Sequence, residues 1–313
     1  MITQHCKPIV PKVLADSTLC ITGYGGYIGR HLVQSLITAG LKPVLIGRPY
    51  LSLPLIEGTS SVPTWNNARE LASYLKKLNN AVLLNLAGHF VSNHSPENIG
   101  ALVSGNLQFP LEIFEALSIS GHSQIVNIGT SWEYSDCGKK DPSNLYANLK
   151  ASNAYHLKWY AQNFPLRAIN LKLNDTYGGN DTREKLLPYL KQSWRDRKTA
   201  KLRSASQVIN LLYITDVVRG ILHAAAQTFS LERHREVTAF LLSDYTLTLG
   251  ELINTINQKT TPNLIVRFKE DPKLKSVQRG VWENAPRLKG WEPKFSLQNG
   301  LKRYFMDENE NQI

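Results

Sequence analysis

The sequence has 313 residues, of which 42% are hydrophobic and 19% are charged, and its formal net charge is +11. This composition excludes an intrinsically disordered chain, and the length is enough for about two domains. The excess of positive charge favours an anionic partner, such as a nucleotide, a phosphorylated cofactor, nucleic acid or a membrane surface.

The basic residues are dispersed without a long basic run, so nucleic acid is not expected as the partner. The three cysteines, Cys6, Cys20 and Cys137, have unrelated spacings that fit neither a zinc site nor a disulfide framework. No run of about 18 apolar residues could span a membrane, and the first residues lack the apolar stretch of a signal peptide. We therefore expect a soluble cytoplasmic protein from a reducing compartment, with no membrane partner and no metal.

The first half of the chain alternates strand patterns with helix patterns. Short apolar, β-branched runs predict strands, and apolar residues three and four apart predict helices, the first of which ends at Gly40. Strands are expected at 18–23, 42–49, 81–88, 123–131 and 167–175, and helices at 27–40, 68–78, 97–121 (interrupted near Pro110) and 146–164. This alternation is typical of an α/β fold with a doubly wound parallel sheet.

The alternation is lost after about Asn174. The remaining patterns predict a strand and a helix over 209–226, a helix over 246–258 capped by Thr248, and a turn and helix over 290–305. We expect this half to form a smaller region whose segments interleave with the first domain.

Three glycines, Gly23, Gly26 and Gly29, follow the first predicted strand and open the first predicted helix in TLCITGYGGYIG. They let the backbone approach a pyrophosphate closely, and they direct the unpaired N–H groups of the helix start at its charge. Glycine clusters are also common in tight turns. Here the preceding strand and the following helix favour a dinucleotide site.

The end of the second predicted strand indicates which dinucleotide binds. A carboxylate at that place would accept a hydrogen bond from the ribose 2′-hydroxyl of NAD. The chain has Gly47 and Arg48 instead, and no acidic residue lies between Asp16 and Glu57. A guanidinium suits a 2′-phosphate, so NADP(H) is predicted, although Arg48 could also be a solvated loop residue.

Tyr146 and Lys150 lie four residues apart in YANLK, so they share one face of the predicted helix 146–164. A nearby ammonium lowers the pKa of a tyrosine, which can then give or take the proton of a hydroxyl or ketone oxygen. Thr130 or Ser131, at the end of the strand 123–131, would be the second hydrogen-bond partner of that oxygen. With 13 tyrosines in the chain, one such pair could also arise by chance.

Six segments, TGYGGYIG, LNLAG, NIGTSWEYS, YANLK, LKLNDTYG and INLLYITDVV, occur in an order and spacing that resemble the extended short-chain dehydrogenase/reductases, and the resemblance covers residues 18 to 304. It implies a Rossmann domain that binds a nicotinamide dinucleotide, followed by a smaller C-terminal α/β region that holds a nucleotide-sugar. We accordingly expect an NADP-binding Rossmann domain over 1–174, with a returning strand and helix at about 208–226, and a nucleotide-sugar-binding region over 175–313.

Within this family, NIGTSWEY and NDTYGGNDTREKLLPYL are most similar to the CDP-abequose and CDP-paratose synthases. That resemblance implies reduction of the 4-keto group of a CDP-linked dideoxyhexose with NADPH, in the biosynthesis of deoxysugars for lipopolysaccharide O-antigen. By position it makes Thr130 the catalytic hydroxyl, Tyr146 the general acid, Lys150 its partner and Asn106 the support of the lysine. Relatives also imply a homodimer through the helices around 107–117 and 146–164.

The resemblance and the residue chemistry together give two sets of expected ligand contacts. Arginine can bind phosphate through two parallel hydrogen bonds, which favours basic residues for the substrate diphosphate. The cofactor-binding set is Gly23, Gly26, Tyr27, Ile28, Gly29, Arg48, Leu86, Ala87, Gly88, Asn106, Tyr146 and Lys150, and the substrate-binding set is Ser131, Trp132, Asn174, Arg183, Lys185 and Arg279.

Departures from the family motifs narrow the reaction. Nucleotide-sugar 4,6-dehydratases carry Asp-Glu directly after the catalytic threonine, where this chain has Ser131 and Trp132, and alternation would direct Glu133 away from the pocket. A 4-epimerase with bound NAD stays the alternative, since it uses the same Thr, Tyr and Lys. A non-catalytic NADP-binding module stays open as well. Cys137 and His89 are expected to be non-catalytic.

Overall fold

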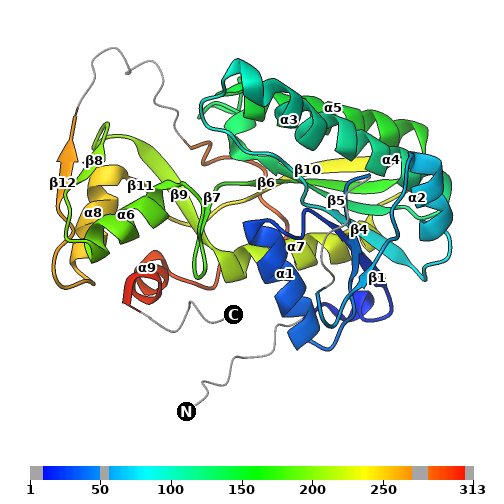
Figure 1. The fold of residues 1–313 in the computed structure, drawn as a ribbon, viewed down its shortest axis with the longest axis horizontal. Helices are drawn as coiled ribbons and strands as arrows, with labels where there is room; N and C mark the ends of the chain where they lie inside the picture. The colour runs from blue at the N-terminus through cyan, green and yellow to red at the C-terminus, as the bar shows by residue number, and fades with distance from the viewer. Residues whose placement is uncertain (1–9, 50–55, 270–280, 307–313) are drawn as a thin grey trace.

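The computed structural model describes residues 10–49, 56–269 and 281–306. At its centre lies a seven-stranded sheet in the order β10-β6-β5-β4-β1-β2-β3, in which all pairings are parallel (Figure 1). Its strands are β1 (Thr18–Thr22), β2 (Val44–Ile46), β3 (Ser60–Ser61), β4 (Ala81–Asn85), β5 (Gln124–Thr130), β6 (Arg167–Leu173) and β10 (Arg235–Leu241). The predicted α/β fold with a doubly wound parallel sheet is confirmed.

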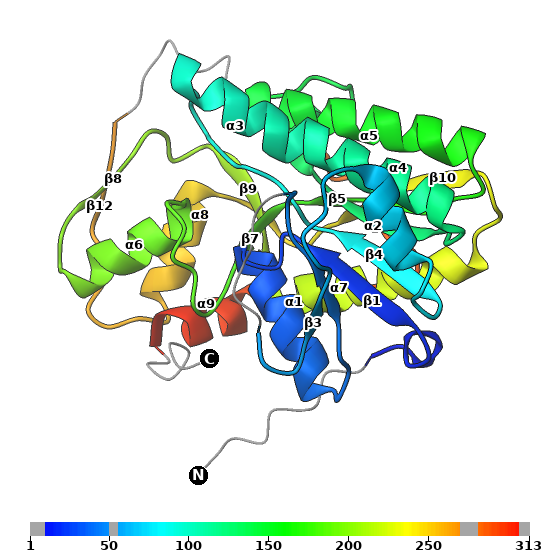
Figure 2. The same ribbon diagram turned by 45° about the vertical axis from the view of Figure 1, so that its right-hand side comes forward.

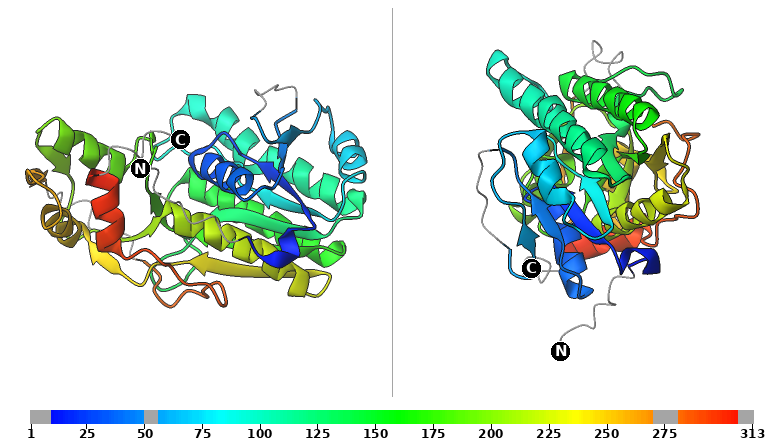
Figure 3. Two further views of the ribbon diagram at one scale, coloured as in Figure 1. Left: turned by 90° about the horizontal axis from the view of Figure 1, so that it is seen from below. Right: turned by 90° about the vertical axis from the view of Figure 1, so that its right-hand side faces the viewer.

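Helices cover both faces of this sheet, as the end-on view of Figure 3 shows. The helices α1 (Tyr27–Thr38) and α7 (Ile214–Gln227) pack on one face, and α2 (Ala68–Leu75), α4 (Phe109–Ser120) and α5 (Leu145–Asn163) pack on the other. Successive side chains of a strand point to opposite faces. Leu19 and Ile21 therefore join the core under α1 and α7, whereas Cys20 joins the core under α2 and α4.

The helix predicted over 97–121 is interrupted, as expected, next to Pro110. It consists of α3 (Ile99–Val103), a π-helical turn over Ser104–Gln108, and α4, in which Pro110 lies in the first turn. Proline has no N–H to donate to the carbonyl of residue 106, so the regular α-helical ladder cannot pass through this point. The wider turn contains Asn106, which was expected at the cofactor site.

The strand and helix at about 208–226 were expected to return to the large sheet, and for the strand this expectation is wrong. The helix of that unit, α7, does pack on the large sheet, but β9 (Val208–Tyr213) pairs with β7 (Asp175–Tyr177) and β11 (Thr246–Thr248) in a separate sheet. The strand that returns to the large sheet is β10, on β6. An apolar run satisfies either sheet equally well, so local sequence did not decide its partner. The proposed domain boundary near residue 174 falls between β6 and β7.

The smaller region lies beside the carboxyl ends of the large sheet (Figure 2). Besides the three-stranded sheet, it contains β8 (Ala200–Leu202) paired with β12 (Val266–Phe268), and the helices α6 (Leu186–Arg195), α8 (Leu249–Asn257) and α9 (Leu297–Met306). The predicted cap is confirmed: Thr248 accepts a hydrogen bond from the N–H of Glu251, whose carboxylate accepts from the N–H of Thr248.

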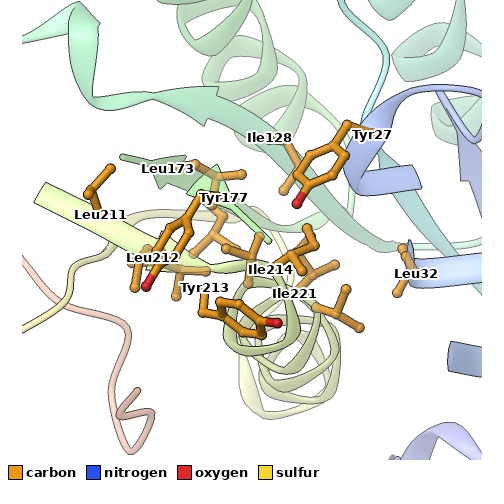
Figure 4. Packing of buried hydrophobic residues seen from close by; sticks show 14 of the residues in the cluster. Tyr27, Leu32, Ile128, Leu173, Tyr177, Leu211, Leu212, Tyr213, Ile214 and Ile221 are labelled. Atoms are coloured by element: carbon orange, nitrogen blue, oxygen red, sulfur yellow. The ribbon is translucent and has the colours of Figure 1, made fainter. Parts of the chain in front are cut away.

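One apolar core runs from the large sheet into the smaller region. Figure 4 shows Ile128 and Leu173 of the large sheet next to Tyr177 and the β9 residues, with Tyr27 of α1 beside them. Tyr177 packs edge-on against Tyr213 with ring centroids 5.4 Å apart. Burial of such large side chains fixes how the two regions pack together, and this packing sets the geometry of the site at their junction.

A row of buried, hydrogen-bonded polar side chains, one threonine and three asparagines, crosses the large sheet. Thr22, Asn85, Asn127 and Asn170 are in register on neighbouring strands. The Thr22 hydroxyl donates to Asn85 (2.6 Å), the Asn85 amide donates to Asn127 (2.7 Å), and Asn127 donates to Asn170 (3.2 Å) and to Asn153 of α5 (2.8 Å). Because buried polar groups are costly when unpaired, this row fixes α5 in position on the sheet.

Candidate active site

The glycine turn after β1 is built by close backbone contacts. Gly23 has a φ of +67°, and a Cβ on it would lie 2.6 Å from the carbonyl carbon of Leu86. A Cβ on Gly29 would collide with the carbonyl oxygen of Gly23. These two positions therefore require glycine, which holds the start of α1 against the end of β4.

The start of α1 fits the phosphates of a dinucleotide. Gly26 is the N-cap of α1 and offers no side-chain cap to the first N–H groups of the helix, those of Tyr27 and Ile28. A Cβ on Gly25 would meet nothing within 4 Å, so this side of the turn is open. The unpaired N–H groups and the helix dipole favour an anion there. Leu86, Ala87 and Gly88 follow β4 beside the turn.

Arg48 follows β2 and is exposed. Its Nη2 lies 3.2 Å from the point that a Cβ on Gly105 would occupy, and the Cβ of His89 lies 2.9 Å from that point. The guanidinium therefore reaches from the end of β2 towards the loop after β4. This places one fixed positive charge on the β2 side of the glycine turn.

Lys150 is buried beneath the loop after β4. Its Nζ donates to the carbonyl oxygens of Ala87 (2.8 Å) and Ile128 (3.1 Å), and burial lowers its pKa to about 8. The expected support from Asn106 is indirect. The Asn106 amide donates to the His89 carbonyl (2.8 Å) and accepts from the His89 N–H (3.1 Å), and so holds the loop that covers the lysine.

Tyr146 lies at the start of α5, half-buried against Phe90, with the two ring centroids 5.1 Å apart. Its pKa was expected to be lowered by Lys150, and this expectation is wrong. Burial raises the pKa of Tyr146, the charge of Glu133 raises it further, and Arg183 is the cation that opposes the shift. The Lys150 ammonium is hydrogen-bonded to two carbonyl oxygens, and the charges that act on the pKa of Tyr146 are those of Glu133 and Arg183.

Thr130 ends β5 and begins a tight turn over Ser131–Glu133. Its hydroxyl accepts a hydrogen bond from the N–H of Trp132 (3.3 Å), and its own N–H donates to the Glu133 carboxylate (2.9 Å). Glu133 is buried and pairs with Lys172, so it faces away from the open side of the turn, as alternation predicted. The turn lies against α5, so the hydroxyl of Thr130 and Tyr146 are brought to the same edge of the sheet.

Arg183 and Lys185 reach the junction from the smaller region. The Arg183 guanidinium forms two hydrogen bonds of 2.7 Å to the Asp181 carboxylate, and its Cζ lies 4.0 Å above the ring centroid of Tyr27. It also donates to the carbonyl oxygen of Thr176 (2.7 Å). Most of its donors are therefore engaged within the protein.

The Lys185 ammonium lies 4.0 Å from the ring centroid of Phe90 and 5.5 Å from that of Trp132. Burial lowers its pKa. Phe90 also contacts Tyr146, so Lys185 approaches the same aromatic cluster as the candidate acid. Asn174 instead donates to the carbonyl oxygen of Leu241 (3.1 Å).

A cavity of 1170 Å³ opens beside this cluster in the smaller region. Two of its lining residues, Asp181 and Glu184, are acidic, and six are basic: Arg183, Lys185, Lys191, Arg195, Lys201 and Arg203. The excess of positive charge suits an anionic ligand such as a diphosphate. Of the expected substrate residues, Arg183 and Lys185 line this cavity, Ser131 and Trp132 lie in the turn after Thr130, and Arg279 lies outside the described residues.

Sequence reasoning missed three contributors to this site. Phe90 packs between Trp132 and Tyr146, and its place directly after the LNLAG segment and His89 was the available signal. Lys172 pairs with Glu133, and Asp181 pairs with Arg183. No local sequence pattern predicts such pairs, because the partners meet only in the folded chain.

His89 belongs to the loop after β4, where its backbone is hydrogen-bonded to Asn106. Cys137 is exposed, and a hydrogen bond from Ser135 lowers its pKa. Among the residues that the structure describes, no three His, Cys, Asp or Glu side chains gather as metal ligands would. Over the same residues, none of the helices has the length and apolar character needed to cross a bilayer.

The family model described as "NAD dependent epimerase/dehydratase family" matches residues 19–238. The chain is 26% identical to a CDP-abequose synthase of Yersinia pseudotuberculosis, over 81% of this chain and 89% of that protein. It is 22% identical to a CDP-abequose synthase of Salmonella muenchen, over 92% and 97%. The structure of Thermus thermophilus UDP-glucose 4-epimerase in complex with NAD superposes with a TM-score of 0.74, covering 92% of this chain and 97% of that chain at 19% identity.

Proposed function

The chain belongs to the NAD-dependent epimerase/dehydratase family, and we propose that it reduces the 4-keto group of a nucleotide-diphosphate deoxyhexose with NADPH. The relatives named CDP-abequose synthase support a nucleotide-sugar-modifying enzyme and favour a CDP-linked substrate. The observation that carries the proposal is geometric: Tyr146 and Trp132 both pack on Phe90 at the turn after Thr130, while the nearby carboxylate of Glu133 is buried against Lys172.

A protonated tyrosine suits reduction. The hydroxyl groups of Thr130 and Tyr146 would donate hydrogen bonds to the ketone oxygen and so polarise the C4 carbonyl. When bound, NADPH would supply the hydride that the C4 carbon accepts. As negative charge develops on the ketone oxygen, the O–H bond of Tyr146 breaks, and the sugar oxygen takes the proton and becomes the new hydroxyl. The tyrosinate then regains a proton from solvent.

Elimination of water is disfavoured at this site. A dehydratase needs an acid and a base at the sugar, and the two positions after Thr130 are Ser131 and Trp132. Glu133 cannot replace them, because its side chain is 2% exposed and bonded to Lys172 and to the Thr130 N–H. Of the described carboxylates, Asp181 is likewise engaged, by Arg183.

The basic cavity would hold the nucleotide diphosphate. It adjoins Lys185, whose ammonium lies over Phe90 and Trp132, and the sugar would extend from there towards Tyr146. Aromatic faces without hydrogen-bond partners suit a sugar that lacks hydroxyl groups.

We also propose a homodimer through α4 and α5, because Tyr155 and Trp159 of α5 are 67% and 50% exposed. A measurement of the molar mass in solution tests this homodimer.

NADPH absorbance tests the proposed function directly. Purified protein is mixed with CDP-4-keto-6-deoxy or CDP-4-keto-3,6-dideoxy sugars, with a dTDP-4-keto sugar and NADH run alongside. We expect stoichiometric loss of NADPH with a CDP ketone. Loss with none of the ketones, together with interconversion of 4-hydroxy nucleotide-sugars by protein-bound NAD, would assign the chain to the 4-epimerases instead.

Arg48→Ala is expected to weaken NADPH binding by about 10- to 100-fold and to leave NADH binding within about twofold. Removing the exposed guanidinium from a phosphate contact costs the equivalent of one charge-assisted hydrogen bond, about 1.5–3 kcal/mol. Arg69→Ala, which removes an exposed arginine of α2, is the control. The two dissociation constants are measured by nucleotide fluorescence. Equal losses for both nucleotides would disprove the 2′-phosphate role.

A further inference from the structure

A buried ion pair lies directly beneath the turn that carries Thr130. The Lys172 ammonium of β6 is 2.5 Å from the Glu133 carboxylate, and the two side chains are 0% and 2% exposed. Gly129 is the neighbour of Lys172 across the strands, and a Cβ on it would lie 2.7 Å from both Glu133 Oε1 and Lys172 Nζ. The pair thus fills the space that a side chain at 129 would need.

Stability alone gives little reason to bury this pair. Removing two charges from water costs several kcal/mol for each ion, and apolar residues of similar volume are often as stabilising or more so. A structural role would be served equally well by two apolar side chains. The contacts of the pair therefore point to what it does.

The second carboxylate oxygen holds the proposed catalytic threonine. Glu133 Oε1 accepts the N–H of Thr130 at 2.9 Å, while Lys172 holds the other oxygen. The Thr130 hydroxyl accepts from the N–H of Trp132, which leaves its own hydrogen to donate towards the open side of the turn. Lys172 fixes Glu133, and Glu133 fixes the backbone at Thr130.

The lysine also offsets the charge of the carboxylate. The Glu133 carboxylate raises the pKa of both Tyr146 and Lys150. The Lys172 ammonium acts in the opposite direction and lowers the pKa of Lys150. Glu236 and Lys140 are the other charged groups that act on Lys172. An unpaired carboxylate under Thr130 would oppose negative charge on the ketone oxygen. The paired carboxylate anchors the turn without that cost.

We propose that Glu133 and Lys172 are positioning residues: as a neutral buried pair they hold the Thr130 backbone so that its hydroxyl faces the substrate ketone. This inference rests on the proposed ketoreductase function, and it extends the set of residues that the reaction needs beyond Thr130, Tyr146 and Lys150. Neither residue touches the substrate.

Two double variants separate anchoring from stability. Both contain Lys172→Met, so neither leaves a buried charge unpaired. Glu133→Gln keeps an oxygen that accepts the Thr130 N–H, whereas Glu133→Met has a similar length and no such oxygen. We expect the Gln double variant to lose turnover by about threefold and the Met double variant to lose it by about 100-fold, since small misplacement of a reacting group costs about that much. NADPH affinity and KM for the ketone should change by less than about threefold in both.

Turnover and exchange of the Thr130 amide hydrogen decide the outcome. Turnover is measured in both double variants, in wild type and in Glu115→Gln, which removes the charge of an α4 carboxylate that accepts a hydrogen bond from the Tyr160 hydroxyl of α5 and should leave turnover unchanged. Exchange of the Thr130 amide hydrogen, followed by mass spectrometry, should be faster in the Met double variant alone. Equal turnover and equal exchange in the two double variants would overturn the inference. Absent turnover in wild type would instead reject the proposed function, and the exchange measurement would still test the anchor.

Discussion

Tyr146→Phe is expected to lower kcat for ketone reduction by roughly 10²- to 10⁴-fold while NADPH affinity stays within about twofold, because a general acid contributes about this much to proton transfer. The substitution removes the proton that the sugar oxygen receives and keeps the ring that packs on Phe90. Single-turnover absorbance of NADPH measures the chemical step, and nucleotide fluorescence measures the affinity.

The raised pKa of Tyr146 also predicts how reduction depends on pH. A tyrosine that keeps its proton at neutral pH is an acid, so wild-type reduction should not require high pH. Tyr245→Phe, at a tyrosine that is 58% exposed and lies outside α4 and α5, is the control and should leave kcat unchanged. If Tyr146→Phe kept kcat within threefold of wild type, the proton would come from another group.

Lys150→Met is expected to lower kcat by at least about 100-fold. It is also expected to remove the free-energy cost of burying the Lys150 ammonium, which destabilises the wild-type fold at neutral pH. The ammonium is hydrogen-bonded to the carbonyl oxygens of Ala87 and Ile128, so its loss frees the loop after β4 from α5. Turnover and denaturant-induced unfolding of the cofactor-free protein measure the two effects.

The pH dependence of that stability cost follows from the pKa of Lys150, which burial lowers from 10.5 to about 8. Below pH 8 the lysine is protonated in both the folded and unfolded states, and the buried ammonium costs about 3 kcal/mol. Between about pH 8 and 10.5 the unfolded chain binds the proton that the folded chain has lost. Wild type therefore becomes more stable with rising pH relative to Lys150→Met, by about 3 kcal/mol between pH 7 and 10.5.

The control for this trend is Lys158→Met, which removes an exposed lysine from the same helix. Its free energy of unfolding should differ from that of wild type by the same amount at pH 7, 9 and 10.5. A constant difference between wild type and Lys150→Met over this range would show that the Lys150 ammonium is not desolvated in the folded protein.

Local patterns gave the glycine turn, the order of the strands and helices and the Tyr146–Lys150 spacing. They succeeded because each depends on residues within a few positions of one another: glycines at a strand–helix junction, apolar periodicity, and two side chains four apart on one helix. The interruption of the helix near Pro110 is of the same kind, since a missing N–H acts on the residue four positions earlier. The identity of the family followed from the order of these segments.

Partners that are distant in sequence were decided only by the tertiary structure. Glu133 and Lys172 meet across 39 positions, and β9 could have joined either sheet. The pKa of Tyr146 was expected to fall and rises instead, because desolvation depends on every group packed around a side chain and not on its neighbour one helical turn away. The sequence by itself thus determined which residues can react, whereas their charge states, their anchors and the basic cavity beside them arise where the two regions pack together.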